Sequence, residues 1–213
     1  FYPSARPSDR EFAQSLGRAE IINADSRQLY KHMNLGTAKI SAEEMAGIPH
    51  HLLSILDPRE QANIGWYKRE AMKVIDDIHA RGLLPILVGG SMLYISSIID
   101  GLEPNPYRRS GGSPSRTKSP CPYDLTIIGM QIPREELHRQ INERTKRCLE
   151  SGWIEEVQKL LDMGYTVDDP GMMACGYREI AKEIRNSKFE IRNKSEIQNT
   201  LYETIAAKTR QYA

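Results

Sequence analysis

The sequence has little cysteine. Its 213 residues include three, Cys121, Cys148 and Cys175, an odd number at long spacings. This count argues against a disulfide framework, and the spacings match no CxxC zinc site. We therefore expect reduced thiols in a cytoplasmic protein with no metal ligands among them. No apolar run reaches the ~18 residues of a membrane span, and no signal peptide is present, so we expect no membrane contact.

The sequence also lacks an excess of one charge. Lys and Arg total 29 against 28 Asp and Glu, which gives no global field that would favour a polyanionic partner. Any nucleic-acid contact must come from local patches. The strongest local patch lies in residues 104–122, which are rich in Pro, Gly and Ser and contain no acid. It carries Arg108, Arg109, Arg116 and Lys118, and its composition predicts a linker.

What the sequence does have is an alternation of strands and helices before that linker. Residues 20–24 and the apolar run 83–88 are expected to be strands, with a further strand or extended edge within 50–57. Helices are expected over 11–19, 65–82 and 91–100. This order predicts an α/β core with a parallel sheet over residues 1–103. Because 83–88 is apolar on both faces, we expect helices to cover both sides of it. Residues 123–213 are predicted to contain a returning strand, 124–132, and then helices over 134–150, 153–163, 177–185 and 196–212.

Polar side chains follow two of the predicted strands directly. Asp25 ends the first, and Gly89, Gly90 and Ser91 follow the run 83–88. The carboxyl ends of parallel strands meet at one edge, where ligands bind, so we expect both breaks on the same rim. Asp25 could be a base, a magnesium ligand or only the cap of the next turn. The paired glycines suit either a close phosphate or a tight turn.

Three other patterns have a plain structural interpretation beside a functional one. His50 and His51 are neighbours in an extended stretch and face opposite ways, which favours packing over a shared metal. Residues 176–179, GYRE, combine a glycine, an aromatic ring and a cation, which suits a loop that stacks on a base and touches phosphate, or simply a helix start. A cluster of basic residues in the helix 134–150 is typical of a solvated face; its members are Arg139, Arg144, Lys146 and Arg147.

Five stretches taken together resemble one family, the tRNA dimethylallyltransferases, also called tRNA isopentenyltransferases. In chain order they are INADSRQLYKHMNLGTAK (22–39), GIPHHLLSILDP (47–58), RGLLPILVGGSMLYISSIIDGL (81–102), CGYRE (175–179) and TRQYA (209–213). The resemblance implies a P-loop-NTPase-like parallel sheet flanked by helices, followed by a mainly helical C-terminal part. It implies transfer of a dimethylallyl group from dimethylallyl diphosphate to N6 of adenine 37 in the tRNA anticodon loop, with Mg²⁺ as cofactor, by a monomer in the cytoplasm.

The resemblance also implies roles for individual residues. Asp25 would be the base that takes the proton of the adenine amine, and Ser91 would place its hydroxyl near the reacting centre, where the family has a threonine. The tRNA would be held by Asp25, Ser26, Arg27, Gln28, Met173, Ala174, Cys175, Gly176, Tyr177 and Arg178. Arg144 and Arg210 would bind the diphosphate.

The sequence departs from this family at two places. The family's phosphate-binding P-loop should lie near the start, yet residues 1–12, FYPSARPSDREF, contain no glycine and no lysine. The 1–103 core therefore lacks a recognisable P-loop, and the basic linker 104–122 replaces an insertion domain that grips the anticodon stem. We expect this chain to be weak or inactive as given, with reduced tRNA affinity. Two alternatives stay open: a P-loop-type nucleotide or nucleoside phosphotransferase, and a non-catalytic remnant that binds RNA through the linker.

Overall fold

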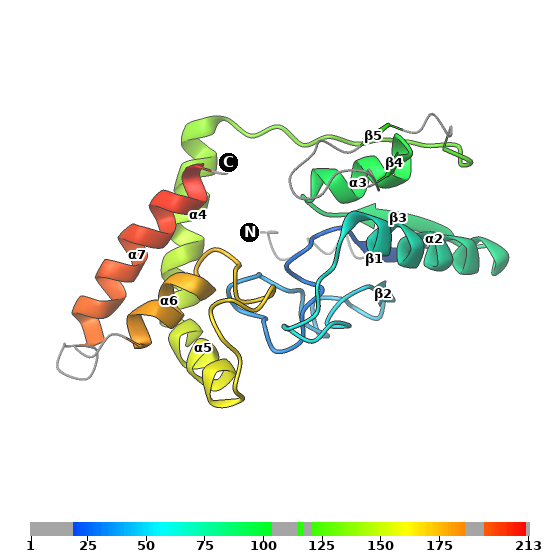
Figure 1. Cartoon of the computed structure of the whole chain (residues 1–213). Helices are drawn as coiled ribbons and strands as arrows, with labels where there is room; N and C mark the ends of the chain where they lie inside the picture. The colour runs from blue at the N-terminus through cyan, green and yellow to red at the C-terminus, as the bar shows by residue number, and fades with distance from the viewer. Residues whose placement is uncertain (1–18, 104–114, 117–120, 186–193, 212–213) are drawn as a thin grey trace.

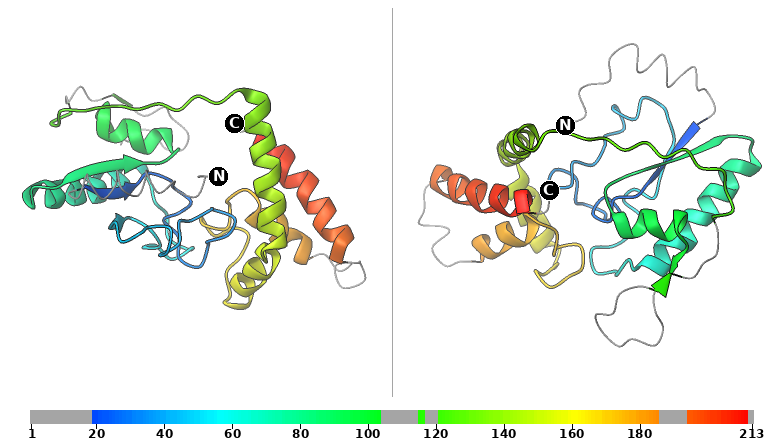
Figure 2. Two further views of the ribbon diagram at one scale, coloured as in Figure 1. Left: turned by 180° about the vertical axis from the view of Figure 1, so that it is seen from behind. Right: turned by 90° about the horizontal axis from the view of Figure 1, so that it is seen from above.

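The computed structural model describes residues 19–103, 115–116, 121–185 and 194–211. In chain order the elements are β1 (Ala19–Asn23), β2 (His50–His51), α2 (Ile64–Ala80), β3 (Leu84–Val88), α3 (Met92–Ile99), β4 (Leu102–Glu103), β5 (Ser115–Arg116), α4 (Arg134–Glu150), α5 (Trp153–Asp162), α6 (Tyr177–Ile184) and α7 (Lys194–Gln211). Figure 1 shows an α/β part with the sheet and α2–α3 on one side and α4–α7 on the other. Residues 121–133, here called the bridging segment, join the two parts, as both views of Figure 2 show.

The main sheet is parallel, as the sequence predicts. Its described strands lie in the order β2-β1-β3, and both pairings are parallel. Helix α2 begins after Asn63, whose side chain accepts a hydrogen bond from the Trp66 N–H at 2.8 Å, an N-cap that satisfies one free helix donor. The helix packs against β1 and β3, and α3 packs against α2. The crossover helix thus holds β1 and β3 side by side, with their carboxyl ends at one edge.

Two stacked tyrosines, one on α2 and one on α3, support the end of β1. Tyr67 on α2 and Tyr94 on α3 stack with ring centroids 3.9 Å apart and planes 6° apart. The Tyr67 hydroxyl donates to the Asn23 carbonyl at 3.0 Å, in the last residue of β1. Burial raises the pKa of Tyr94 to about 12, so its phenol stays protonated at neutral pH. These contacts give the strand end a rigid support.

One strand expectation is wrong. Residues 124–132 form no strand: Ile127, Ile128 and Met130 are 71%, 86% and 82% exposed, and no described strand lies beside them. An apolar pattern gives a strand only where a neighbour supplies hydrogen bonds, which the pattern itself does not reveal. The expected cover of β3 on both faces stays a prediction, because residues 1–18 and 104–114 lie outside the described part of the chain. Strand β3 pairs only with β1 among the described strands, its residues are at best half-buried, and Leu84 is 52% exposed.

The helices of the C-terminal part confirm the sequence prediction to within two residues at each end. Helix α4 packs against α7, and α5 against α6. The apolar faces of α5, α6 and α7 meet in a core that includes Val157, Leu160, Ile180, Leu201 and Ile205. No described helix is long and apolar enough to traverse a lipid bilayer.

Some expectations lie outside the described residues. These are the helix at 11–19, apart from its last residue, the segment 1–12, and most of the linker 104–122. Within the linker region the structure describes one antiparallel pair, β4 with β5, in which Leu102 pairs with Arg116 and Glu103 with Ser115. The expected weakness of the chain therefore stays a prediction.

A buried carboxylate on β1, that of Glu20, links this strand to Arg81 and His51. Glu20 of β1 is 6% exposed, and its two oxygens accept from the Arg81 guanidinium at 2.5 and 2.7 Å. His51 Nε2 lies 2.6 Å from Glu20 Oε2, whereas His50 Nδ1 lies 2.8 Å from the Ile48 carbonyl oxygen. The two histidines thus face different partners, as their spacing predicts. The Arg81 hydrogen bonds, with a smaller contribution from His51, lower the pKa of Glu20 to about 2.

Substituting Glu20→Gln should lower the free energy of unfolding at pH 7 by about 1.5–3 kcal/mol, because charge-assisted hydrogen bonds to Arg81 are lost. The folded-state pKa is depressed, so this stabilisation is complete above about pH 4.5 and disappears as the pH falls toward about 2. Urea unfolding of both proteins between pH 7 and pH 2.5 measures the difference. Glu70→Gln on α2, whose carboxylate pairs with Lys73 at 2.9 Å and is 30% exposed, is the control. A Glu20→Gln effect that does not shrink in acid would contradict the assignment.

Candidate functional site

The two polar breaks of the sequence lie on one rim, as predicted. The Ser26 N–H donates to Ser91 Oγ at 2.9 Å, and the Ser91 N–H donates to the Ala24 carbonyl at 3.1 Å. A Cβ at position 89 would lie 2.2 Å from the Ala24 carbonyl carbon, so Gly89 is required by the close approach of the two chains. The loop that follows β3 therefore supports the loop that follows β1.

Asp25 makes the turn contact expected of a cap and also lines a cavity, while its roles as a base or magnesium ligand stay predictions. Its Oδ1 accepts from the Arg27 N–H at 2.8 Å, and its own N–H donates to Asn23 Oδ1 at 2.9 Å. The carboxylate therefore stabilises the turn after β1, which is the cap-like interpretation. It also lines a cavity, which the capping role alone does not explain.

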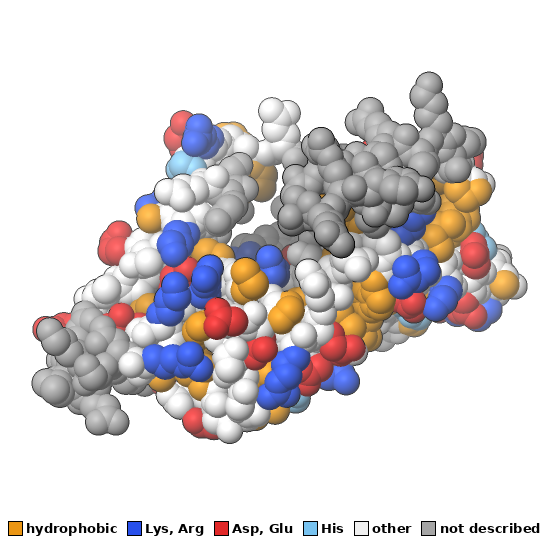
Figure 3. All heavy atoms as spheres, in the orientation of Figure 1, with side chains coloured by type: hydrophobic (Ala, Val, Ile, Leu, Met, Phe, Trp, Pro, Cys, Tyr) orange, Lys and Arg blue, Asp and Glu red, His pale blue; other side chains and the backbone are white. Residues whose placement is uncertain are grey.

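This cavity has a volume of about 520 Å³ and lies between the α/β part and the helical part. Seven of the predicted site residues line it, from segments more than 100 residues apart in the sequence: Asp25, Arg27, Arg144, Met173, Ala174, Cys175 and Arg178. The space-filling view shows a hollow between the two parts with Lys and Arg side chains beside it (Figure 3). The cavity is large enough for a small ligand.

The other predicted site residues do not line the cavity. Ser91 contacts the backbone of Ser26, and Gln28 Nε2 donates to the carbonyls of Thr37 and Ala38 at 3.2 and 3.3 Å. Arg210 Nη1 donates to Asn142 Oδ1. Their proposed contacts with substrate stay predictions, and each holds a neighbouring segment in place.

Gly176 and Tyr177 are buried and do not line the cavity either. Tyr177 is fully buried, and its hydroxyl donates to Glu156 Oε1 at 2.5 Å. The Tyr177 ring of the GYRE motif therefore points into the core, and Tyr177 is the first residue of helix α6. A helix start was the structural alternative for this motif. Its contact with tRNA stays a prediction.

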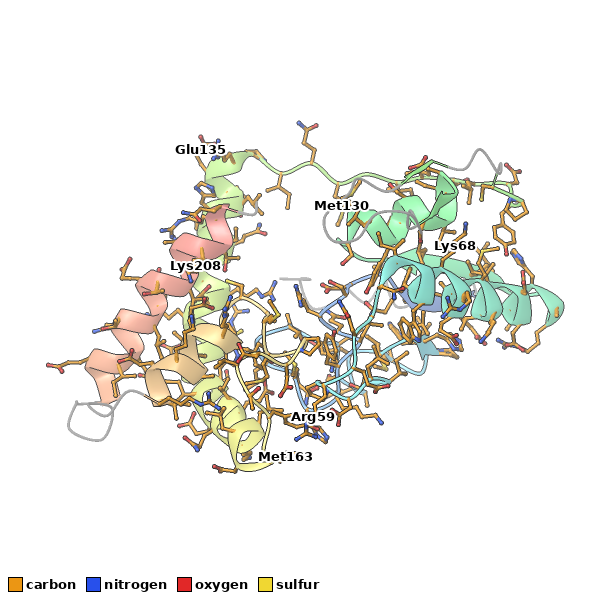
Figure 4. All side chains as sticks on the ribbon, viewed as in Figure 1. Arg59, Lys68, Met130, Glu135, Met163 and Lys208 are labelled. Carbon is orange, nitrogen blue, oxygen red and sulfur yellow. The ribbon has the colours of Figure 1, made fainter. Side chains whose placement is uncertain are left out.

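The cavity wall carries more positive than negative charge. Its basic residues are Arg27, Arg144, Arg178 and Lys208, against the acids Asp25 and Glu179. Lys208, labelled on α7 in Figure 4, donates to Glu179 Oε1 at 2.6 Å. Four cations against two carboxylates leave a local excess that suits an anionic group such as a phosphate or diphosphate.

Two thiols lie in the cavity wall, and both are half-buried. Cys148 Sγ donates to the Leu35 carbonyl at 3.3 Å, and Cys175 Sγ lies 3.6 Å from Thr209 Oγ1. Burial raises the pKa of both thiols, so they stay protonated at neutral pH. Cysteine-based covalent catalysis does not fit this site.

Three residues that the sequence analysis missed shape the loop 34–39. Glu156 on α5 accepts from the Asn34 and Leu35 N–H groups, and the Trp153 ring packs beside Gly36. Lys39 Nζ donates to the Tyr30 carbonyl at 2.5 Å and to Ser54 Oγ at 2.8 Å, and burial lowers its pKa to about 8. These are long-range contacts, for which the sequence gives no local signal.

The residues present fit a metal ion carried by phosphate better than one held by protein alone. Among the described residues, no group of three or more His, Cys, Asp or Glu side chains could hold a metal. Mg²⁺ commonly binds through one or two carboxylates and the substrate's phosphates. Asp25 in the cavity wall would supply such a carboxylate.

Known proteins similar to this chain share one family. The family model described as IPP transferase matches residues 28–114 and 105–213. The tRNA dimethylallyltransferase of Thermomicrobium roseum is 34% identical over 80% of this chain and 68% of its own length; that of Geobacter sulfurreducens is 35% identical over 76% and 70%. The crystal structure of a Staphylococcus epidermidis tRNA isopentenylpyrophosphate transferase superposes with a TM-score of 0.78 at 28% identity, covering 95% of this chain and 81% of that one. The similarity confirms the predicted fold class, a P-loop-NTPase-like α/β part followed by a mainly helical part.

Proposed function

Because the chain belongs to the IPP transferase family, we propose that it transfers the dimethylallyl group of dimethylallyl diphosphate to N6 of adenine 37 in the tRNA anticodon loop. The observation that carries this proposal is the cavity, which brings a carboxylate, several cations and the loop Met173–Arg178 together. The adenine amine needs a proton acceptor, the diphosphate needs positive charge, and the RNA needs a surface to lie on. One cavity offers all three.

The reaction forms a bond between adenine N6 and the allylic carbon and breaks the bond from that carbon to the diphosphate oxygen. The amine lone pair is delocalised into the ring, so N6 attacks well only as its proton leaves. Asp25 accepts this proton, a contribution worth about 10²–10⁴-fold in rate. Its anchored turn keeps the carboxylate at the cavity wall, because the Arg27 N–H holds Oδ1 at 2.8 Å.

The leaving diphosphate gains negative charge as the carbon–oxygen bond breaks. Arg144 and Arg178 line the same cavity and stabilise this charge in the transition state. Arg144 Nη2 also donates to the Gly36 carbonyl at 3.3 Å, which orients its side chain along the wall. Mg²⁺, when bound with the diphosphate, would neutralise further charge on it.

The adenine must leave its stack before it can reach Asp25. Enzymes that modify a base commonly extrude it into a pocket. Arg27 projects into the cavity from the turn after β1, and Met173, 51% exposed, belongs to the loop on the opposite side. In the proposed complex these two sides flank the flipped nucleotide. The proposal includes a monomer that works in the cytoplasm.

A direct test is incubation of the chain with an unmodified tRNA transcript and dimethylallyl diphosphate, followed by mass analysis of the digested nucleosides. Prenylated adenosine is expected, at the low rate that the sequence predicts for the chain as given. Absence of product with enzyme in excess, both from this chain and from a version that carries a restored P-loop, would overturn the proposal. Phosphorylated nucleotide without a prenyl increment would favour the phosphotransferase. Salt-sensitive RNA binding without turnover would favour the remnant, whose basic residues lie mostly outside the described residues.

The diphosphate site can be tested separately. Arg144→Ala should raise the KM for dimethylallyl diphosphate by about tenfold, because a charge-assisted hydrogen bond is worth about 1.5–3 kcal/mol. Arg139→Ala on the same helix is the matched control, since that guanidinium bonds Glu136 and Glu143 and does not line the large cavity. Initial rates at saturating tRNA measure both. Equal KM values for the two variants would remove Arg144 from the site.

A further inference from the structure

One carboxylate, that of Glu156, joins helix α5 to the loop 34–38, which forms part of the cavity wall. Glu156 on α5 accepts from the Asn34 N–H at 3.1 Å, from the Leu35 N–H at 3.0 and 3.2 Å, and from the Tyr177 hydroxyl at 2.5 Å. The Gly36 N–H in turn donates to the Tyr177 hydroxyl at 3.2 Å. Three successive backbone donors therefore end on Glu156, directly or through Tyr177. Consecutive N–H groups of this kind form a concave anion site.

The surrounding packing makes this arrangement rigid. Trp153 is 3% exposed, and its ring meets the Tyr177 ring edge-on, with centroids 5.6 Å apart. A Cβ on Gly36 would lie 2.2 Å from the Trp153 ring, and one on Gly176 would lie 2.0 Å from it. The indole is thus enclosed between the loop 34–39 and the start of α6. Burial and the neighbouring Glu156 raise the pKa of Tyr177, so its hydroxyl keeps the proton that it donates.

The loop held by Glu156 belongs to the candidate site. Gly36 and Thr37 line the cavity, and the Gly36 carbonyl accepts from Arg144 Nη2 at 3.3 Å. The carbonyls of Thr37 and Ala38 accept both described hydrogen bonds of the Gln28 amide. A shift of residues 34–38 would therefore move one wall of the cavity and release Gln28.

We propose that Glu156 is a positioning residue for the RNA substrate. It fixes the loop 34–38, and through this loop it orients Gln28 and the cavity wall. The inference rests on the proposed function. It assigns to Glu156 an effect on RNA binding, because the residues held by this loop include Gln28, which is predicted to contact tRNA. Arg144 contacts the same loop through only one long bond, 3.3 Å to the Gly36 carbonyl, and keeps its charge when that bond is lost. The affinity for the prenyl donor should therefore depend less on Glu156 than RNA binding does.

The first experiment compares Glu156→Gln with the wild-type chain. The glutamine keeps the size of the side chain, but its NH₂ group cannot accept the bonds that the second carboxylate oxygen receives. Hydrogen–deuterium exchange in residues 34–36 should rise by about tenfold, and the Kd for a tRNA anticodon stem-loop should rise by about five- to tenfold. The KM for dimethylallyl diphosphate should stay within about twofold. Asp162→Asn, an exposed carboxylate on the same helix, is the matched control and should change none of these values.

The second experiment adds Tyr177→Phe, which removes the hydroxyl between Glu156 and the Gly36 N–H. Alone, it should raise the Kd for the stem-loop while leaving the donor KM in place, which tests the inference even if Glu156→Gln does not fold. In the double variant the two effects should combine to less than their product, because both act through one loop. If the two increases in Kd simply multiply in the double variant, Glu156 and Tyr177 do not act through the same loop, and the inference is overturned.

The outcomes separate the inference from the proposed function. Equal losses for RNA and donor would indicate a purely structural role and overturn the inference. Faster exchange with an unchanged Kd would overturn it as well. A wild-type chain that binds no stem-loop would overturn the proposed function together with the RNA role of Glu156, while the exchange rates would still show whether Glu156 holds the loop.

Discussion

Replacing Asp25 by asparagine should lower the rate of prenyl transfer by about 10²–10⁴-fold, the usual contribution of a general base. Asparagine retains an oxygen that can accept the Arg27 N–H bond, so the turn after β1 is kept while basicity is lost. The Kd for tRNA should change by less than about threefold. Single-turnover reactions with excess enzyme and radiolabelled dimethylallyl diphosphate give the range needed to measure such a loss.

Two comparisons make this test specific. Asp100→Asn changes an exposed carboxylate after α3 and should leave the transfer rate unaltered. Asp25→Ala removes the turn contact as well and should also lower the stability of the fold. Transfer by Asp25→Asn at a rate close to that of the wild type would exclude Asp25 as the base.

Gly176→Ala should destabilise the fold strongly, with a loss of about 3 kcal/mol in the free energy of unfolding. Gly176 has a φ of +90°, where an L side chain is strained, and its Cβ would lie 2.0 Å from Trp153 Cη2. The indole cannot retreat easily, because Gly36 is packed against its other atoms. Urea denaturation followed by circular dichroism measures the change.

Two further variants identify the cause. Gly90→Ala introduces a Cβ that meets nothing within 4 Å and should change stability by no more than about 0.5 kcal/mol. Gly176→Ala combined with Trp153→Leu should lose less than the sum of the two single changes, since the smaller side chain makes room. Additive losses would show that backbone strain, rather than the indole, is responsible.

The parallel core and the rim of the site were predictable because their signals are local. An apolar run followed by Gly89, Gly90 and Ser91 marks the end of a strand, and the same holds for Asp25 after 20–24. Parallel strands bring their ends to one edge, so the contact of Ser26 with Ser91 follows from topology. Helical periodicity likewise located α4 to α7.

The contacts that complete the site were not predictable, because they join distant segments. Glu156 looks like a solvated glutamate in its helix, and only the fold brings Asn34 and Leu35 to it. The GYRE motif suggested a stacking tyrosine, yet the direction of the Tyr177 ring depends on Trp153. The bridging segment shows the converse case: its pattern is that of a strand, but a strand also requires a neighbour.

That segment also bears on how the purified protein will behave. The segment between the two parts of the molecule carries three exposed apolar side chains, Ile127, Ile128 and Met130; Met130 is labelled in Figure 4. Exposed apolar segments of this kind promote association between molecules at high protein concentration. Concentrated samples should therefore turn cloudy on standing, and dilute ones should remain clear.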